Sequence, residues 1–286
     1  MNSDELKTYL NDIYKDKSDE LVQLESVLDL YKIDICRKDW NYYQFNELNI
    51  PRVSNILDST IGKAYLNQWA ASLGSRYNAV RNKILNTGTL VHLYIEDFFL
   101  HGRKEFHPLI EKKANIREAL NCYANFLRWY YDMDKAGFSI KPLLIEKETS
   151  TPYYAGTCDF VAQISNNEST MNYIIDFKTS KVISFEYFIQ TMFYVIGFEF
   201  NRNILGDLSF PEIDGIGILR IDKKEEKYQF VTLDLYSFTD MGIINDLRKC
   251  VYQMTEWFYM QNSMKLQIND FLKNHINLDE VLKDVH

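Results

Sequence analysis

Residues 155–180 read AGTCDFVAQISNNESTMNYIIDFKTS, and this stretch decides the fold. Asp159 opens one apolar run, and Asp176 and Lys178 close the next one. The polar segment between the two runs predicts a turn, so we expect the runs to be neighbouring strands. Carboxylates can hold a hard cation, and an ammonium group can orient water or neutralise developing negative charge. The pattern is therefore typical of metal-dependent phosphodiester cleavage.

The spacing within the second run gives each charged residue a role. Lys178 lies two residues after Asp176, so on a strand both side chains project to the same face. We expect Asp159 and Asp176 to hold the cation and Lys178 to reach the attacking water. Each aspartate alone is typical of a turn cap, and the lysine alone of a solvated strand end. The three together favour the metal interpretation.

Hydrophobic periodicity places these strands in an α/β domain. Strands are expected at residues 143–149, 157–164, 173–177, 214–221 and 228–235. Helical segments are expected after a break at 49–52 and up to residue 85, and then at 90–100, 112–134, 184–200 and 239–260. Thr87, Gly88 and Thr89 are expected to interrupt the helical region and to cap the helix that follows. A meander of three strands followed by a helix and another strand is the skeleton of an α/β nuclease core.

Three segments follow from this pattern. Residues 1–50 are expected to be a helical N-terminal segment, residues 51–141 a helical region, and residues 142–286 the core with its C-terminal helices. Within the helix at 112–134, one apolar face is expected to carry Ile116, Leu120, Tyr123, Leu127 and Tyr130.

Composition restricts the class of protein. The chain has 286 residues, of which 46% are hydrophobic, enough for a substantial core. Its four cysteines stand far apart, so neither a zinc site nor a disulfide framework is expected. No apolar run is long enough to span a bilayer, and the N-terminus lacks the features of a signal peptide. We therefore expect a cytoplasmic protein without a membrane partner.

Charge is unevenly distributed along the chain. The net charge of −8 counts against a general nucleic-acid coat protein, because lysine and arginine supply most non-specific affinity for phosphates. Residues 61–88 nevertheless contain no acid. The basic residues of this strip are Lys63, Arg76, Arg81 and Lys83. The strip predicts either a track for DNA phosphates or an ordinary solvated helix face.

Four motifs occur in a fixed order along the chain. They are GTLVH at 88–92, AGTCD at 155–159, IIDFKTS at 174–180 and QTMFY at 190–194. In this order they resemble the PD-(D/E)XK nuclease superfamily, specifically its RecB-like exonuclease branch, which includes phage exonucleases and the mitochondrial genome maintenance exonuclease. The resemblance covers about residues 51–200 and implies a restriction-endonuclease-like core, a central mixed sheet flanked by helices.

The resemblance assigns further residues to the site. It implies that His92 helps to bind a second metal ion, and that the Phe177 carbonyl is a further ligand. It also implies that Gln190 and Tyr194, one helical turn apart, support Lys178. Two acids are secondary candidates for metal ligands: Glu96, one turn after His92, and Glu146, on the strand before the turn at Gly156. Thr179 and Ser180 either contact phosphate or cap the strand.

The resemblance also implies which cofactors to expect. One or two Mg²⁺ or Mn²⁺ ions are expected. Some members of the branch hold an iron–sulfur cluster on one upstream cysteine and three cysteines near the C-terminus. Cys250 is the only cysteine after Cys158, so no such cluster is expected here.

The expected function is that of a metal-dependent DNA exonuclease that prefers single-stranded DNA, in phage-type replication, recombination or repair. The preference rests on aromatic residues that could stack bases ahead of the core, namely Tyr42, Tyr43, Phe45, Trp69 and Tyr77. Burial in the core is the alternative role for them. Two other functions stay open: a structure-specific or restriction-type endonuclease, and a non-catalytic nucleic-acid-binding protein that keeps the fold.

Overall fold

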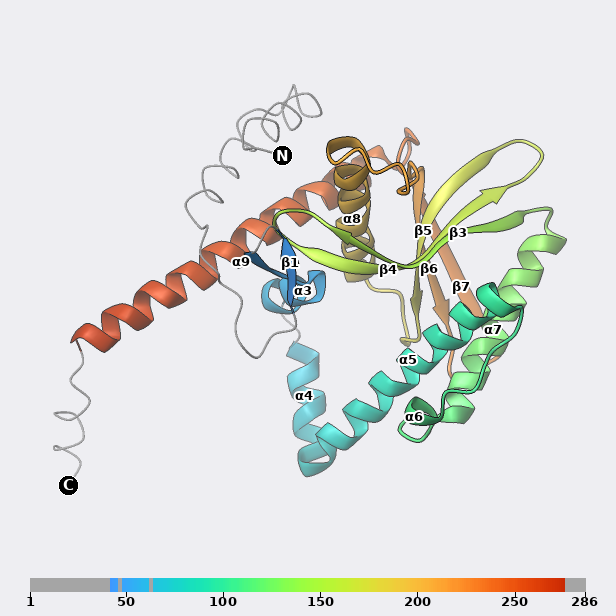
Figure 1. Cartoon of the computed structure of the whole chain (residues 1–286). Coiled ribbons are helices and arrows are strands. Elements are labelled where there is room, and N and C mark those ends of the chain that lie inside the picture. The colour runs from blue at the N-terminus through green and yellow to red at the C-terminus, as the bar shows by residue number, and fades with distance from the viewer. Residues whose placement is uncertain (1–41, 46–47, 62–63, 276–286) are drawn as a thin grey trace.

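The structure is a computed structural model of the 286-residue chain, and it describes residues 42–45, 48–61 and 64–275 (Figure 1). A five-stranded mixed sheet forms the centre, in the order β3-β4-β5-β6-β7. The strands β3, β4 and β5 form an antiparallel meander, β6 runs parallel to β5, and β7 is antiparallel to β6. The bounds are β3 Ser139–Ser150, β4 Ala155–Ser165, β5 Thr170–Lys178, β6 Gly215–Ile221 and β7 Tyr228–Asp234.

Helices surround the sheet, and a short hairpin precedes them. The helices are α3 Val53–Thr60, α4 Ala64–Leu73, α5 Tyr77–His101, α6 Pro108–Glu111, α7 Ile116–Lys135, α8 Phe185–Glu199 and α9 Met241–His275. A 3₁₀ turn at Gly74–Arg76 and a π-helical turn at Phe200–Ile204 extend α5 and α8. The hairpin consists of β1 Tyr42–Phe45 and β2 Leu48–Pro51.

Each face of the sheet has its own apolar core. On one face α5 and α7 cover the strands, with Val91, Phe126 and Trp129 buried against Phe160 and Phe177. On the other face α3, α8 and α9 cover them, and the buried side chains there include Ile56, Val161, Ile174, Phe193 and Phe258. Since β6 is buried on both faces, its sequence GIGILRI is apolar almost throughout. The expected α/β class, with a mixed sheet flanked by helices, is confirmed.

The N-terminal expectation is wrong where the structure describes it. Residues 42–45 and 48–50 belong to the hairpin β1–β2 rather than to a helix, and residues 1–41 lie outside the described residues. Aromatic residues such as Tyr42 and Tyr43 favour strands. The hairpin is also fastened to the core, because the Tyr43 hydroxyl lies 3.1 Å from Thr157 Oγ1 and Arg52 forms a parallel bridge with Ala155.

The expected break at Thr87, Gly88 and Thr89 is also wrong, because α5 runs through it without interruption. Both threonine hydroxyls donate to carbonyls one turn earlier, at 2.7 Å from Lys83 O and 3.2 Å from Leu85 O. Both hydroxyls therefore donate within the helix. A Cβ at position 88 would lie 3.8 Å from Thr179 Oγ1, an ordinary contact distance, so the space around Gly88 does not require a glycine.

The buried face of α7 differs from the expected one. Ile116 and Leu120 are exposed, whereas Ala119, Cys122, Phe126 and Trp129 are buried. Tyr123, Leu127 and Tyr130 of the expected face are partly buried against the core, so the expected face overlaps the observed one without coinciding with it. Small buried residues such as Ala119 and Cys122 contribute little to a hydrophobic pattern, which explains the error.

The last helix, α9, is longer than expected, since it begins at Met241 and extends to His275 instead of ending at residue 260. Polar and charged residues recur along its length. Across the part of the chain that the structure describes, none of the helices combines the length and the apolar sequence needed to cross a membrane.

We predict that Gly197→Ala lowers the free energy of unfolding by about 1–3 kcal/mol. A Cβ at this position in α8 would lie 2.5 Å from Thr149 Oγ1, and Thr149 is buried and bonded to Asn201. The matched control is Gly242→Ala in the first turn of α9, where nothing lies within 4 Å of the added carbon. The control should be neutral or stabilising by up to about 1 kcal/mol. Urea unfolding measures both, and equal values for the two variants would contradict the steric explanation.

Candidate metal centre

The two aspartates lie where β4 and β5 separate. The β4–β5 ladder ends at the pair Phe160–Ile175, so the next residues outward, Asp159 and Asp176, are not paired in it. Beyond this point β4 pairs with β3 alone and β5 with β6 alone. Asp159 Oδ2 accepts a hydrogen bond of 2.9 Å from Phe177 N, so a carboxylate takes the place of the lost strand carbonyl.

Lys178 and Asp176 form a buried ion pair. Asp176 is 1% exposed, and its Oδ1 accepts a hydrogen bond of 2.9 Å from Lys178 Nζ. Its Oδ2 lies 2.7 Å from the same nitrogen but receives no directed hydrogen bond in the described structure. Lys178 Nζ also donates to Gln190 Oε1 at 3.0 Å and lies 5.1 Å from the centre of the Tyr187 ring. The ammonium group is therefore held in one position.

Gln190 is held in turn by Tyr194. Its Nε2 donates to the Tyr194 hydroxyl at 2.8 Å, so one turn of α8 supports the lysine, as the motif predicts. The Tyr194 ring fills space that Gly156 leaves open on β4, because a Cβ at Gly156 would lie 2.8 Å from Tyr194 Cε1. The glycine of the AGTCD motif is thus required for close packing of β4 against α8.

His92 reaches the same place from α5, on the other side of the sheet. Its Nε2 lies 3.2 Å from Phe177 O, a distance at which the imidazole N–H donates to the carbonyl. Its Nδ1 faces two acids, at 3.5 Å from Asp159 Oδ1 and 3.9 Å from Glu146 Oε1.

Glu146 completes a group of three potential ligands. Ile145 pairs with Phe160 and Lys147 with Cys158, so Glu146 stands opposite Asp159 across β3 and β4. It has a φ of 47°, a left-handed value that is uncommon for a residue other than glycine and is often found at functional sites. Ligand atoms of His92, Glu146 and Asp159 all lie within 4.8 Å of one another.

This donor set fits a divalent cation. Carboxylate oxygens suit Mg²⁺ and Mn²⁺, and an imidazole nitrogen is a common ligand of transition metals, so one nitrogen with two oxygens is compatible with Mn²⁺ in particular. Asp176 does not belong to this group of three, because its carboxylate is directed to Lys178. The Phe177 carbonyl is bonded to His92.

The charges at the site depend on one another. Burial by itself would lower the pKa of His92, but the charge of Asp159 and the hydrogen bonds that Asp159 and Glu146 accept from the imidazole raise it above its usual value. Burial would raise the pKa of Asp159, yet the charge of His92 holds it below its usual value. Burial raises the pKa of Asp176, which Lys178 offsets only in part. The pKa of Lys178 is raised against the effect of burial by Asp176 and Asp159, so its ammonium stays protonated at neutral pH.

The other predicted site residues lie outside this cluster. Burial and the nearby charge of Glu146 raise the pKa of Glu96, so it is a neighbour of the three ligands and not one of them. The Ser180 hydroxyl donates to Val182 O at 2.7 Å and is thus used within its loop. Thr179 faces Gly88. Arg76, Arg81 and Lys83 are exposed on α5 and the turn before it, and Lys63 lies outside the described residues.

Two residues of the site were not expected from the sequence. Tyr187 lies under the Lys178 ammonium, three residues before Gln190 on the same face of α8. Arg220, 3% exposed, donates to Ser180 O at 3.2 Å and to Asp222 Oδ2 at 3.0 Å, so it fixes the loop that follows Lys178. The helical spacing from Gln190 could have indicated Tyr187, whereas a lone arginine in an apolar strand carries no local signal.

Comparison with known proteins gives little further information. The chain matches no family model, and no curated protein matches it. Among solved structures it is similar to the crystal structure of SSO0001, at 10% sequence identity and a TM-score of 0.24, over 59% of this chain and 74% of that one. A likeness of this size carries no argument about function, which has to come from the site itself.

We predict that Mn²⁺ raises the melting temperature of the protein and that Asp159→Asn removes most of this effect. A ligand that binds only the folded state stabilises it by about 2.7 kcal/mol at about 100 times its dissociation constant. The variant replaces the carboxylate of one of the three potential ligands by a neutral amide. Differential scanning calorimetry with and without Mn²⁺ measures the shift.

The control is Glu168→Gln, which removes one negative charge from the exposed loop between β4 and β5. It should keep the shift of the unmodified protein. A shift in Asp159→Asn as large as that of the control would exclude Asp159 as a ligand.

Proposed function

We propose that the protein is a metal-dependent DNA exonuclease with a restriction-endonuclease-like core, of the RecB-like branch of the PD-(D/E)XK superfamily. The observation that carries the proposal is the convergence of Lys178, fixed by Asp176 and Gln190, with the ligands His92, Glu146 and Asp159 where β4 and β5 separate. An ammonium group beside a set of cation ligands is what phosphodiester hydrolysis needs.

The arrangement of strands supports the proposed core. An antiparallel meander, β3–β4–β5, leads through α8 into the parallel neighbour β6, and the motif residues lie on β4, β5 and α8. This is the order in which the resemblance places them.

The metal would be held by His92, Glu146 and Asp159, and the resemblance adds Asp176 and the Phe177 carbonyl. Mg²⁺ or Mn²⁺, when bound, polarises the scissile phosphate and lowers the pKa of water. No cysteine cluster is needed for this chemistry. Cys122 and Cys158 are buried, and Cys250 is half-buried and apart from them in sequence.

Lys178 acts as a cation and not as a base in this proposal. Because Asp176 and Asp159 raise its pKa, it stays protonated and can donate a hydrogen bond to a phosphate oxygen or orient the attacking water without taking its proton. Asp176 and Gln190 each accept a hydrogen bond from the ammonium, and Tyr194 orients the amide of Gln190. These three residues therefore position the charge before substrate arrives.

Two aromatic residues near the site favour single-stranded substrate. Tyr43 contacts Thr157, two residues before Asp159, so the hairpin β1–β2 lies next to the ligands. Tyr42 beside it is 42% exposed, and an exposed ring can stack on an unpaired base. Trp69 and Tyr77 pack on each other, with ring centres 5.4 Å apart, and are less available. A role in phage-type replication, recombination or repair would suit such an activity.

We predict that Lys178→Ala lowers Mg²⁺-dependent cleavage of linear single-stranded DNA by about 10²–10³-fold, the usual cost of removing one donor that stabilises developing charge. Burial already raises the pKa of Asp176, so this carboxyl can take up a proton when the lysine is absent and the variant can fold. A gel assay with an EDTA control measures the rate.

Lys141→Ala is the control, since it removes an exposed lysine from β3, five residues before Glu146. It should cleave at the unmodified rate. Cleavage by Lys178→Ala at the same rate as Lys141→Ala would refute the catalytic role. If neither the unmodified protein nor either variant cleaved the DNA in Mg²⁺, the result would favour a non-catalytic binding protein.

We also predict that linear single-stranded DNA is degraded while circular single-stranded DNA of the same sequence persists. An exonuclease needs a free end, and the two substrates differ only in that. Time courses on denaturing gels make the comparison. Efficient cutting of the circle would show an endonuclease instead.

A further inference from the structure

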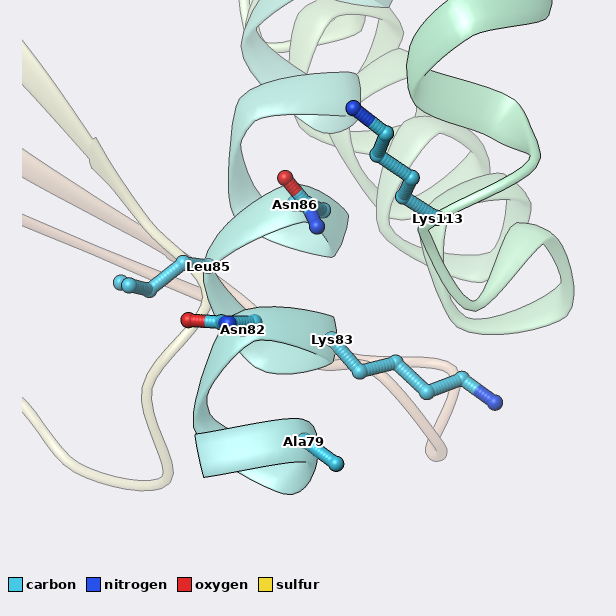
Figure 2. A pocket seen from close by; sticks show the side chains of 6 residues that line it. All are labelled: Ala79, Asn82, Lys83, Leu85, Asn86 and Lys113. Carbon is cyan, nitrogen blue, oxygen red and sulfur yellow. The ribbon is translucent and has the colours of Figure 1, made fainter. Parts of the chain in front are cut away.

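An open groove of about 620 Å³ on the first half of α5 lies apart from the metal centre. Lys83 and Lys113 line it, and Figure 2 shows both on the side of α5 that faces away from Leu85 and the strands. His92 follows Lys83 by nine residues, which is about 180° around the helix. The groove therefore takes no part in holding Lys178, whose neighbours come from β5 and α8.

Tyr187 presents the face of its ring to the Lys178 ammonium group. It precedes Gln190 by three residues on α8, so both side chains lie on the same face of the helix. The centre of the ring is 5.1 Å from Lys178 Nζ, inside the range of about 6 Å in which an aromatic face attracts a cation. The Lys178 side chain is only 18% exposed, and this attraction is stronger where water is largely excluded.

The ring differs in kind from the other two neighbours of the ammonium group. Asp176 Oδ1 and Gln190 Oε1 each accept a hydrogen bond from Lys178 Nζ, which has three N–H donors. An aromatic face attracts the charge without fixing a particular N–H, so the third donor stays available to a phosphate oxygen or to water. Another carboxylate or amide in this place would occupy that donor.

The position of Tyr187 is fixed by its backbone and not by its hydroxyl. Its N–H donates to Ser184 O at 3.1 Å in the first turn of α8. Its carbonyl accepts a hydrogen bond of 2.6 Å from Thr191 Oγ1, and Thr191 is fully buried. Among the described residues, none forms a hydrogen bond with the phenolic hydroxyl. Removal of the hydroxyl alone should therefore leave the ring in place.

We infer that Tyr187 is a positioning residue, and that the face of its ring holds the Lys178 ammonium group in place for the reacting phosphate. The inference rests on the proposed function, and it adds to that reaction a residue that lies outside the four sequence motifs. Asp176 and Gln190 restrain two of the donors, but the flexible lysine side chain could still turn about them. The ring limits this movement, so the charge is in position before the substrate binds.

Steady-state cleavage of linear single-stranded DNA in Mg²⁺ tests the role in catalysis. Tyr187→Leu should lower kcat about tenfold with KM unchanged, because the ring acts on a charge that is needed most in the transition state. Tyr187→Phe keeps the ring and should retain kcat within about twofold. The control is Phe185→Leu, which removes an exposed ring about 200° around the same helix and should cleave at the unmodified rate.

Urea unfolding tests the contact itself and does not require cleavage. Measured as a ratio of unfolding equilibrium constants, the effect of Tyr187→Leu should be about tenfold smaller in a Lys178→Met background, where no ammonium group is left to contact the ring. The effect of Phe185→Leu should be the same in both backgrounds.

Equal kcat values for Tyr187→Leu and Phe185→Leu would overturn the inference, as would equal effects of Tyr187→Leu in the two backgrounds. A kcat for Tyr187→Phe as low as that of Tyr187→Leu would also overturn it, since the hydroxyl would then be the group that acts. If the unmodified protein does not cleave DNA in Mg²⁺, the nuclease is refuted, and the unfolding comparison still decides whether the ring holds the ammonium group.

Discussion

Asp176 is buried beside the partly exposed Asp159, and the positive charges of His92 and Lys178 offset part of the free-energy cost of placing these two carboxylates here. An acidic pair in an apolar sheet would otherwise take up protons. The two positively charged side chains are held by helices on opposite faces of the sheet. His92 belongs to α5 on one face of the sheet, and Lys178 is fixed by α8 on the other. Because β4 and β5 separate here, both layers reach the acids, and the packing of α5 and α8 on the sheet determines the geometry of the site.

Under the proposed function, the elements around this point would form a path for a nucleic-acid substrate. The hairpin β1–β2 contacts β4 through Tyr43 and Thr157, and α5, which carries His92, contains no acid from its start at Tyr77 up to Ile95. The positive charge of this surface is local, since the chain as a whole carries −8. If the proposed function holds, a protein of this net charge would repel nucleic acid from most of its surface, and the acid-free part of α5 would be the place that repels it least.

The parts of the fold that depend on local patterns could be predicted from the sequence. Alternating apolar residues identified the five strands, and the spacing of Asp176, Lys178, Gln190 and Tyr194 brought these side chains together as expected. The expectations were wrong where contacts between residues far apart in the sequence contribute to the structure. Asn115 N bonds to Thr87 at the expected break in α5, the hairpin contacts β4 through Tyr43, and Glu146 has a left-handed backbone that no motif encodes.

Gly156 connects the packing of the sheet to the position of the lysine. Any larger residue there would press on Tyr194, whose hydroxyl is bonded to Gln190, which in turn holds Lys178 Nζ. A single uncharged carbon atom on β4 would therefore displace an ammonium group through two intervening side chains. Side-chain volume at position 156 thus bears on where that charge lies, although no ionisable residue is replaced.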